Sequence, residues 1–188
     1  MILFIDNLLM KKIQTSIHGV FLIELQKFED RRGCFIETWN DKDFGLPNFV
    51  QDNQSFSKKG VLRGLHYQIK EKSQGKLVRC TNGSVYDVVV DLRTFSPTFS
   101  RWYGIYLDRP ELLLWIPPGL AHGFYTTSNE AEFHYKATNY YEPSFESILL
   151  WNDKDLRISW PLDQVPIISG KDISKAKTFL ECPKFDSI

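Results

Sequence analysis

The stretch Val85-Tyr86-Asp87-Val88-Val89-Val90-Asp91-Leu92 decides the fold of this chain. Apolar side chains fill one parity of the stretch, whereas the other parity sets two aspartates beside two valines. A period of two is typical of a β-strand that carries polar groups on one face. The sequence therefore predicts a strand here, and the neighbouring segments are interpreted outward from it.

Similar strand patterns follow this stretch along the chain. Residues 112–116 form a short apolar run that Pro117-Pro118-Gly119 ends, and residues 131–141 are rich in aromatic and small side chains. Turn signals recur at Asn82-Gly83, Ser96-Pro97, Pro118-Gly119 and Glu142-Pro143. Many short strands joined by regular turns indicate a mainly β sandwich or barrel. Helical patterns are weak and are confined to residues 41–44 and to the segment after Lys171.

Length and composition narrow the class of protein further. A chain of 188 residues suffices for one domain with its own core. Its 23 basic and 23 acidic residues cancel, which argues against a nucleic-acid-binding protein. No apolar run reaches the roughly 18 residues of a membrane span, so we expect no membrane partner. The three cysteines imply no disulfide framework and favour a cytoplasmic location.

We interpret residues 1–188 as a single domain with short additions at both ends. Residues 1–11 are expected to be an N-terminal extension, because Met10-Lys11-Lys12-Ile13 is itself an ordinary start of a protein. The apolar opening has its lysines after the apolar run, which is the wrong order for a signal peptide. Residues 173–188 are expected to be a C-terminal tail.

The first segment with side chains suited to catalysis is Arg63-Gly64-Leu65-His66-Tyr67-Gln68. Strand alternation places His66 beside Gly64 on one face, where a ligand would find room, and Arg63 on the other face. A histidine that is hydrogen-bonded inside a sheet explains the segment equally well. The segment alone leaves both interpretations open.

Lys76 and Tyr135 are further candidates on predicted strands. Lys76 shares a face with Val78, and a solvated side chain is the ordinary interpretation of a lysine. The functional interpretation is a cation aimed at an oxyanion or a phosphate. Tyr135 shares a face with Phe133, which suggests core packing, but a tyrosine hydroxyl that faces a cavity can also donate a proton.

Asp172 follows Ser169-Gly170-Lys171 and is typical of an acid in the first turn of a helix. It gains a functional meaning only if the fold brings it to His66. A carboxylate on the far nitrogen of an imidazole orients the ring and raises its basicity.

The segment Pro117-Pro118-Gly119-Leu120-Ala121-His122 fits the Pro-x-Gly-x-x-His pattern of the second cupin motif. Metal-binding cupins supply a His-x-His in their first motif, but the corresponding place here is His66-Tyr67-Gln68. A transition metal needs several converging ligands, and the chain has only four histidines. We therefore predict a cupin without a metal.

Many short motifs occur in one order and together resemble the dTDP-4-dehydrorhamnose 3,5-epimerase family. They are Arg63-Gly64-Leu65-His66-Tyr67-Gln68, Gly75-Lys76-Leu77-Val78-Arg79-Cys80, Asp87-Val88-Val89-Val90-Asp91, Ser96-Pro97-Thr98-Phe99, Leu114-Trp115-Ile116-Pro117, Ala121-His122-Gly123-Phe124, Tyr135-Lys136-Ala137-Thr138-Asn139-Tyr140-Tyr141 and Leu150-Trp151-Asn152-Asp153. The resemblance extends from about residue 12 to residue 172. Each motif alone is weak, but so many in register make a chance resemblance very unlikely.

The resemblance implies a metal-free cupin jelly roll, that is, a double-stranded β-helix barrel with a few short helices, which forms homodimers. It also implies a reaction without a cofactor, which inverts C3 and C5 of the nucleotide sugar dTDP-4-keto-6-deoxyglucose and yields dTDP-4-keto-L-rhamnose. In this reading His66 is the base, Asp172 orients it, Tyr135 is the acid on the opposite face, and Lys76 stabilises the negative charge on O4.

The resemblance assigns further residues to substrate binding. They are Phe28, Arg32, Glu37, Gln51, Asp52, Asn53, Arg63, His122, Tyr140, Glu146 and Lys171. Arg63 matches a diphosphate-binding arginine, and Tyr140 matches the ring that stacks on thymine. Arg32 and Glu37 are expected to serve the partner subunit's site if an N-terminal strand crosses between protomers. Gln54 departs from the pattern, since many relatives have a histidine there.

Three alternatives remain open at this stage. A relative that inverts only one of the two carbons, or that acts on another 4-keto-6-deoxy sugar, would keep His66, Lys76 and Tyr135. A non-catalytic cupin that senses a nucleotide sugar would have no need for the whole set of His66, Lys76, Tyr135 and Asp172. A metal-dependent cupin oxygenase is disfavoured by the missing His-x-His.

Overall fold

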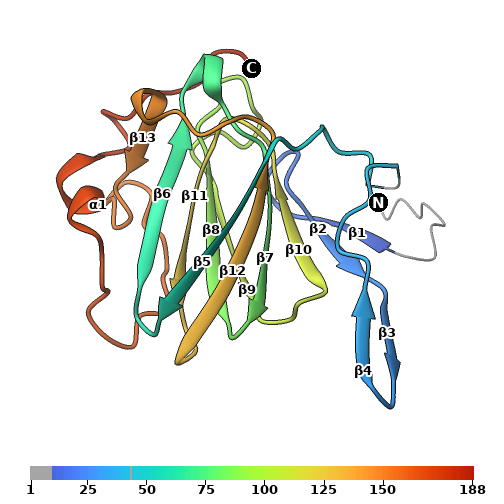
Figure 1. The fold of residues 1–188 in the computed structure, drawn as a ribbon. Helices are drawn as coiled ribbons and strands as arrows, with labels where there is room; N and C mark the ends of the chain where they lie inside the picture. The colour runs from blue at the N-terminus through green and yellow to red at the C-terminus, as the bar shows by residue number, and fades with distance from the viewer. Residues whose placement is uncertain (1–9, 43) are drawn as a thin grey trace.

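The computed structural model describes residues 10–42 and 44–188. These residues form two six-stranded sheets that face each other as the walls of a barrel, and a two-stranded hairpin beside them (Figure 1). The first sheet has the order β1 (Met10–Gln14), β2 (Phe21–Leu25), β10 (Leu112–Ile116), β7 (Lys76–Asn82), β12 (Glu130–Ala137), β5 (Gln51–Lys58). The second has the order β14 (Ala176–Lys177), β13 (Glu146–Leu149), β6 (Leu62–Gln68), β11 (Leu120–Thr126), β8 (Val85–Asp91), β9 (Trp102–Leu107). The hairpin consists of β3 (Lys27–Asp30) and β4 (Gly33–Ile36).

The prediction of a mainly β jelly roll with a few short helices is confirmed. Paired strands within the described residues are antiparallel, except that β13 and β14 are parallel. The helical elements of the same residues are the 3-10 turns η1 (Lys70–Lys72) and η2 (Pro143–Phe145) and the helix α1 (Gly170–Lys175). None of these elements is long and apolar enough to cross a membrane.

Apolar side chains from both sheets fill the space between them. Val78 and Leu114 of the first sheet belong to the same buried cluster as Val89 and Phe124 of the second sheet. Phe124 also stacks on Phe133 of β12, with ring centroids 4.4 Å apart. Burial of this apolar surface is the main source of the attraction between the sheets.

The outer faces of both sheets are covered as well. Trp39 and Phe44, from the segment before β5, pack with Leu77 and Trp115 of the first sheet. The C-terminal segment brings Leu156, Cys182 and Phe185 against the second sheet. Strand β8 is therefore buried on both faces, and even its two aspartates are fully covered.

The two ends of the chain were expected to be additions to the domain. Residues 1–9 of the expected extension lie outside the described residues, whereas Met10 and Lys11 already belong to β1, which pairs with β2. Segment 173–188 continues α1 into β14 and places Phe185 in the apolar cover of the second sheet. The single-domain interpretation stays a prediction.

Two local predictions need correction. Residues 41, 42 and 44 form a turn and a bend rather than a helix, because Gly45, with φ of 57°, and Pro47 follow at once; residue 43 lies outside the described residues. Strand β12 ends at Ala137 and not near Tyr141. The helical prediction for the segment after Lys171 is confirmed only as far as Lys175, since α1 covers Gly170–Lys175 and strand β14 follows.

Strand β6 does not alternate strictly. Its pairing with β11 sets His66 opposite His122 and Arg63 opposite Phe124, so β6 contains one residue more than its partner over this interval. Such a bulge changes the side to which the following side chains point. Arg63 and His66 consequently line the same cavity, and the prediction that they lie on opposite faces is wrong.

The bulge brings the backbones of β6 and β11 unusually close at two glycines. A methyl group on Gly123 would lie 2.4 Å from the carbonyl oxygen of Arg63 and 3.0 Å from the Cα of Gly64. Both neighbours are backbone atoms, which cannot rotate away. Glycine at position 123 is therefore required for the register that places His66.

We expect Gly123→Ala to lower the free energy of unfolding by about 1–3 kcal/mol, because the added methyl group forces the two strands apart. Urea unfolding with an unchanged slope would measure this loss. Gly170→Ala is the matched control, since no atom lies within 4 Å of its added methyl group. Equal stability of both variants would contradict the proposed close contact.

Candidate active site

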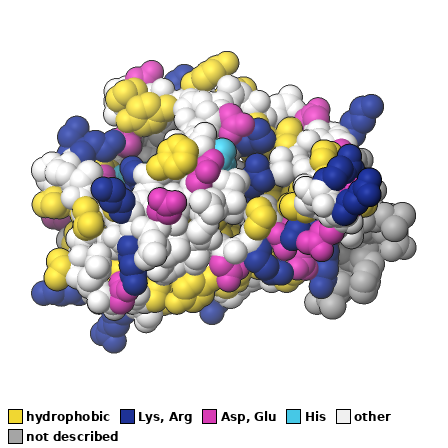
Figure 2. All heavy atoms as spheres, turned by 60° about the horizontal axis from the view of Figure 1, so that its bottom comes forward, with side chains coloured by type: hydrophobic (Ala, Val, Ile, Leu, Met, Phe, Trp, Pro, Cys, Tyr) yellow, Lys and Arg dark blue, Asp and Glu magenta, His cyan; other side chains and the backbone are white. Residues whose placement is uncertain are grey.

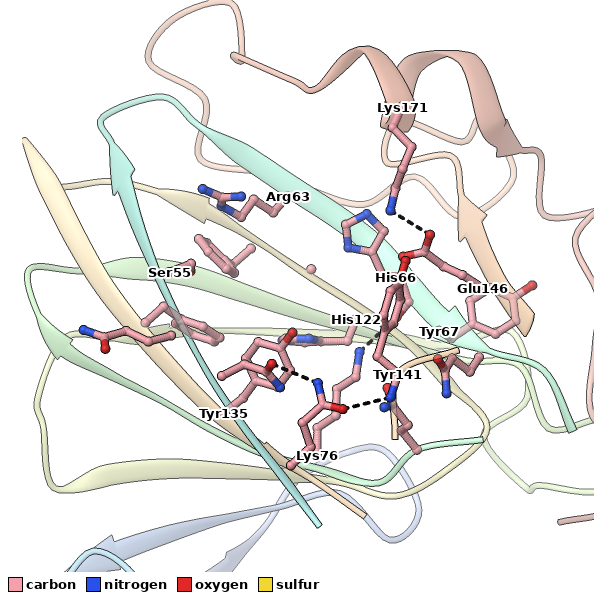
Figure 3. A pocket seen from close by; sticks show the side chains of 18 residues that line it. Ser55, Arg63, His66, Tyr67, Lys76, His122, Tyr135, Tyr141, Glu146 and Lys171 are labelled. Carbon is pink, nitrogen blue, oxygen red and sulfur yellow. Dashed lines mark hydrogen bonds and ion pairs between the residues drawn. The ribbon is translucent and has the colours of Figure 1, made fainter. Parts of the chain in front are cut away.

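A cavity of about 370 Å³ opens between the two sheets. Strands β5, β7 and β12 of the first sheet and β6, β11 and β13 of the second line it, and Lys171 of α1 lies at its edge (Figure 3). Charged side chains of both signs are interspersed over the face of the molecule in Figure 2. The cavity gathers polar groups that come from distant parts of the chain.

His66 and Asp172 are brought together across 106 residues of sequence, as their assignment requires. His66 Nε2 lies 2.8 Å from Asp172 Oδ1, and Asp172 is only 5% exposed. Burial tends to raise the pKa of Asp172, but hydrogen bonds with His66, the Gly64 N–H and Ser169, together with the charge of His66, lower it below its usual value. Asp172 is therefore a carboxylate that holds the ring of His66.

Lys76 is buried in the cavity rather than solvated. It is 9% exposed, and its Nζ lies 3.4 Å from the carbonyl oxygen of His66. Burial lowers the pKa of Lys76 to about 8, against the opposing effect of the carboxylates of Asp87 and Glu146. The side chain is thus an ammonium group in a poorly hydrated place at neutral pH, where its charge acts strongly.

Tyr135 faces Lys76 inside the cavity, and its neighbour in alternation, Phe133, lines the cavity too. The ammonium nitrogen of Lys76 lies 5.9 Å from the centre of the Tyr135 ring. Burial, followed by the charge of Glu146, raises the pKa of Tyr135. The phenol is accordingly protonated at neutral pH and available as a proton donor.

A second buried histidine–carboxylate pair lies behind these groups. His122 Nε2 is 2.8 Å from Asp87 Oδ2, whereas Asp87 Oδ1 has no hydrogen-bond partner among the described residues. Burial raises the pKa of Asp87, although His122 and Lys76 act in the opposite direction. His122 lines the cavity, whereas no role was assigned to Asp87 from the sequence pattern.

Polar side chains on β5 and β6 complete the cavity wall. Arg63 Nε donates to Ser57 Oγ at 3.0 Å, and one terminal nitrogen of Arg63 donates to the Phe56 carbonyl at 3.1 Å. Gln51 Nε2 donates to Asn53 Oδ1 at 2.9 Å. The other end of the same amide, the buried Asn53 Nδ2, has no hydrogen-bond partner among the described residues. An unpaired buried donor that lines a cavity is suited to a ligand oxygen.

Glu146 and Lys171 line the cavity as an ion pair. Lys171 Nζ is 2.7 Å from Glu146 Oε2, and the glutamate side chain is only 14% exposed (Figure 3). The pair joins α1 to strand β13 beside His66.

Five of the predicted binding residues do not line this cavity. Asp52 points to the outer side of β5, where it pairs with Lys136 at 2.6 Å. Tyr140 is 65% exposed, and the next residue, Tyr141, lines the cavity instead. Phe28 and Arg32 lie on the β3–β4 hairpin, where they border a separate hollow, and Glu37 accepts a hydrogen bond from Asn40.

Gln54, where the sequence departs from the family pattern, borders the cavity but directs its amide to the outer side of the first sheet. Gln54 Nε2 donates to Glu132 Oε1, and His134 Nε2 lies 2.9 Å from the same oxygen. Its amide therefore points away from the groups around His66. Among the described residues, no three His, Cys, Asp or Glu side chains are grouped to hold a metal ion; the metal-free interpretation stays a prediction.

The fold and the cavity define a cupin-type jelly roll whose site is equipped for acid–base chemistry on a bound ligand. The family model for dTDP-4-dehydrorhamnose 3,5-epimerase matches residues 14–180. The enzyme of that name from Salmonella typhimurium is 52% identical over 166 residues, which cover 85% of this chain and 91% of the relative. The chain therefore belongs to the dTDP-4-dehydrorhamnose 3,5-epimerase family, which consists of nucleotide-sugar isomerases.

Solved structures agree with this assignment. The 3,5-epimerase from Legionella pneumophila, in complex with dTDP-4-keto-L-rhamnose, has a TM-score of 0.89 and 42% identity and covers 95% of this chain and 100% of its own. A 3'-monoepimerase from Streptomyces bikiniensis, in complex with dTDP-quinovose, has a TM-score of 0.83 and 31% identity, covering 89% of this chain and 87% of its own. The solved structures that resemble this chain thus include enzymes that differ in the number of inverted carbons.

We expect the ammonium group of Lys76 to lose its proton near pH 8, because burial destabilises the charged form. It is charged below that pH and neutral above it. NMR titration of ¹³C-labelled lysine side chains would show one such resonance, and Lys76→Arg would remove it. Titration of every lysine above about pH 10 would contradict the burial of this charge.

Proposed function

We propose that this chain inverts C3 and C5 of dTDP-4-keto-6-deoxy-D-glucose to give dTDP-4-keto-L-rhamnose, a step in the biosynthesis of dTDP-L-rhamnose. The observation that carries the proposal is the His66–Asp172 pair facing Lys76 and Tyr135 across one cavity. The name of the Salmonella typhimurium relative and the ligand in the Legionella pneumophila structure support the same reaction.

The base in this proposal is His66. Both inverted carbons flank the C4 ketone, so removal of either proton leaves an enolate that the carbonyl stabilises. Because His66 Nε2 bonds to the carboxylate of Asp172, Nδ1 is the nitrogen left to accept a proton. Asp172 then stabilises the imidazolium that forms. No cofactor is required, since the ketone of the substrate accepts the electron pair.

Lys76 stabilises the developing charge on O4, and Tyr135 returns the proton. A fixed cation in a poorly hydrated cavity stabilises an oxyanion far more than one in water. His66 belongs to β6 of the second sheet, and Tyr135 belongs to β12 of the first. A sugar ring between the two sheets would have the base on one side and the acid on the other, which is what inversion needs.

The nucleotide half of the substrate is assigned to the polar side chains of β5 and β6 and to the side chains that adjoin them in the cavity. Arg63 and Lys171 are the cations for the diphosphate, since the planar guanidinium suits phosphate oxygens. The unpaired Asn53 Nδ2 offers a donor to a substrate oxygen. The stacking role that the sequence assigned to Tyr140 is available to Tyr141, whose side chain lines the cavity.

A homodimer is part of the proposal. The β3–β4 hairpin projects from the barrel (Figure 1). It carries Phe28 and Arg32, which are not among the residues that line the cavity of the same subunit. Its phenylalanines Phe28 and Phe35 are 46% and 68% exposed. A second copy is the partner whose cavity these side chains would complete, together with Glu37. We place the enzyme in the cytoplasm, which fits its three free cysteines.

The second candidate function is inversion at a single carbon. The monoepimerase from Streptomyces bikiniensis keeps the fold at 31% identity, whereas the 3,5-epimerase from Salmonella typhimurium is 52% identical. The higher identity favours inversion at both carbons.

We expect deuterium at both C3 and C5 when the protein turns over dTDP-4-keto-6-deoxyglucose in heavy water, because each carbon exchanges its proton with the site. NMR of the recovered sugar would count the label. His66→Asn should lower the rate by about 10²–10⁴-fold, as expected for loss of a general base. Label at one carbon would establish the second candidate, and label at neither would refute both.

Sedimentation at micromolar concentration is expected to give a dimer, and Arg32→Ala alone should reduce turnover. Mixing equal amounts of Arg32→Ala and His66→Asn protein should restore up to about a quarter of the activity. About half of the dimers then contain one subunit of each kind, and one of the two sites in such a dimer has both an intact hairpin arginine and an intact base. Fully active monomers, or no recovery on mixing, would contradict the shared site.

A further inference from the structure

The helix α1 has almost no apolar packing against the barrel. It has six residues, and Asp172 is its only buried side chain, whereas Ile173 is 69% exposed. A helix this short is not stable by itself in water. Apolar packing therefore does not fix its position, and polar contacts must do so.

Two consecutive side chains supply these contacts. Asp172 bonds to His66 of β6, and Lys171 bonds to Glu146 of β13 at 2.7 Å. The chain is tied to the barrel before the helix by the Leu62 N–H to the Ile167 carbonyl, and after it by β14. Between these ties, no other side chain of α1 forms a hydrogen bond or ion pair with the barrel among the described residues.

Glu146 is well placed to hold the helix. It lies on β13 opposite Gln68, two residues before Ile148, which is paired with His66 itself. At 14% exposure its carboxylate is largely removed from water, and a carboxylate in that position needs a partner. Lys171 is the partner that the described residues provide.

We infer that Glu146 is a positioning residue for His66, which it controls by clasping Lys171 and thereby fixing α1 and Asp172. The inference rests on the proposed function only in that His66 is the base there. Loss of the clasp lets α1 move, so that Asp172 holds the imidazole of His66 less firmly. Glu146 thus has a task in the free protein, before any substrate binds.

Several charged or titratable groups surround His66. They are Asp172 and Lys171 from α1, Lys76 from β7, Arg63 from β6, His122 from β11, Tyr135 from β12 and Glu146 from β13. A change of charge at Glu146 therefore acts on His66 through space as well as through α1. Motion of the helix and of the ring must therefore be measured directly, through the exchange of their own protons.

The test uses the free protein without nucleotide sugar, so its outcome is independent of the isotope experiment. We expect Glu146→Gln and Lys171→Gln each to speed amide exchange of Ile173 by about two- to fivefold, as loss of a partly exposed ion pair implies. The Nε2 proton of His66, which bonds to Asp172, should also exchange faster with water in both variants when it is followed by NMR. Lys171→Arg keeps the cation and should restore both values.

Lys175→Gln is the matched control, because it removes the same charge from the same helix at an exposed residue. It should leave both exchange rates as in the wild type. The inference is overturned if Glu146→Gln leaves amide exchange unchanged. It is equally overturned if Lys175→Gln speeds exchange as much as Lys171→Gln does, since the effect would then be one of helix charge in general.

Discussion

Burial of polar groups inside an apolar barrel is the constraint on which the site depends. The two sheets are held together by side chains such as Val78, Val89 and Phe133, and the same interior contains Lys76 and Asp87. A charge in such a place is tolerated only where an opposite charge or a hydrogen bond compensates for lost water. The charged groups of the cavity therefore form a network in which each group shifts the pKa values of its neighbours.

The sequence predicted the strands well because both faces of a jelly roll impose a period of two. It located His66, Lys76, Tyr135 and Asp172 through motifs and a resemblance. The direction of Arg63 was missed, because a bulge depends on the pairing of β6 with β11 and has no periodic signal. Asp87 was visible as a polar residue in an apolar strand, which is the signal that could have indicated its role.

The positions of Tyr140 and Tyr141 show a different limit of sequence reasoning. The two tyrosines are adjacent and chemically identical, so a choice between them needs the path of the chain after β12. That strand ends at Ala137, and the N–H of Tyr141 then bonds to Gln51 Oε1. A side-chain amide on β5 thus helps to determine which ring faces the cavity, and no local pattern contains this information.

In the proposed reaction, the two sheets control stereochemistry by carrying different proton-transfer groups. A planar enolate can be protonated on either face, so the protein must determine which face receives the proton. His66 and Tyr135 differ in the sheet that carries them and in their chemistry, since one is paired with a carboxylate and burial keeps the other protonated. In the proposed reaction Lys76 is common to both steps, because the charge on O4 is the same whichever neighbouring carbon has lost its proton. One cation with two opposed proton carriers would then suffice for inversion at either carbon, and the way the sugar ring is presented to them would decide which carbon reacts.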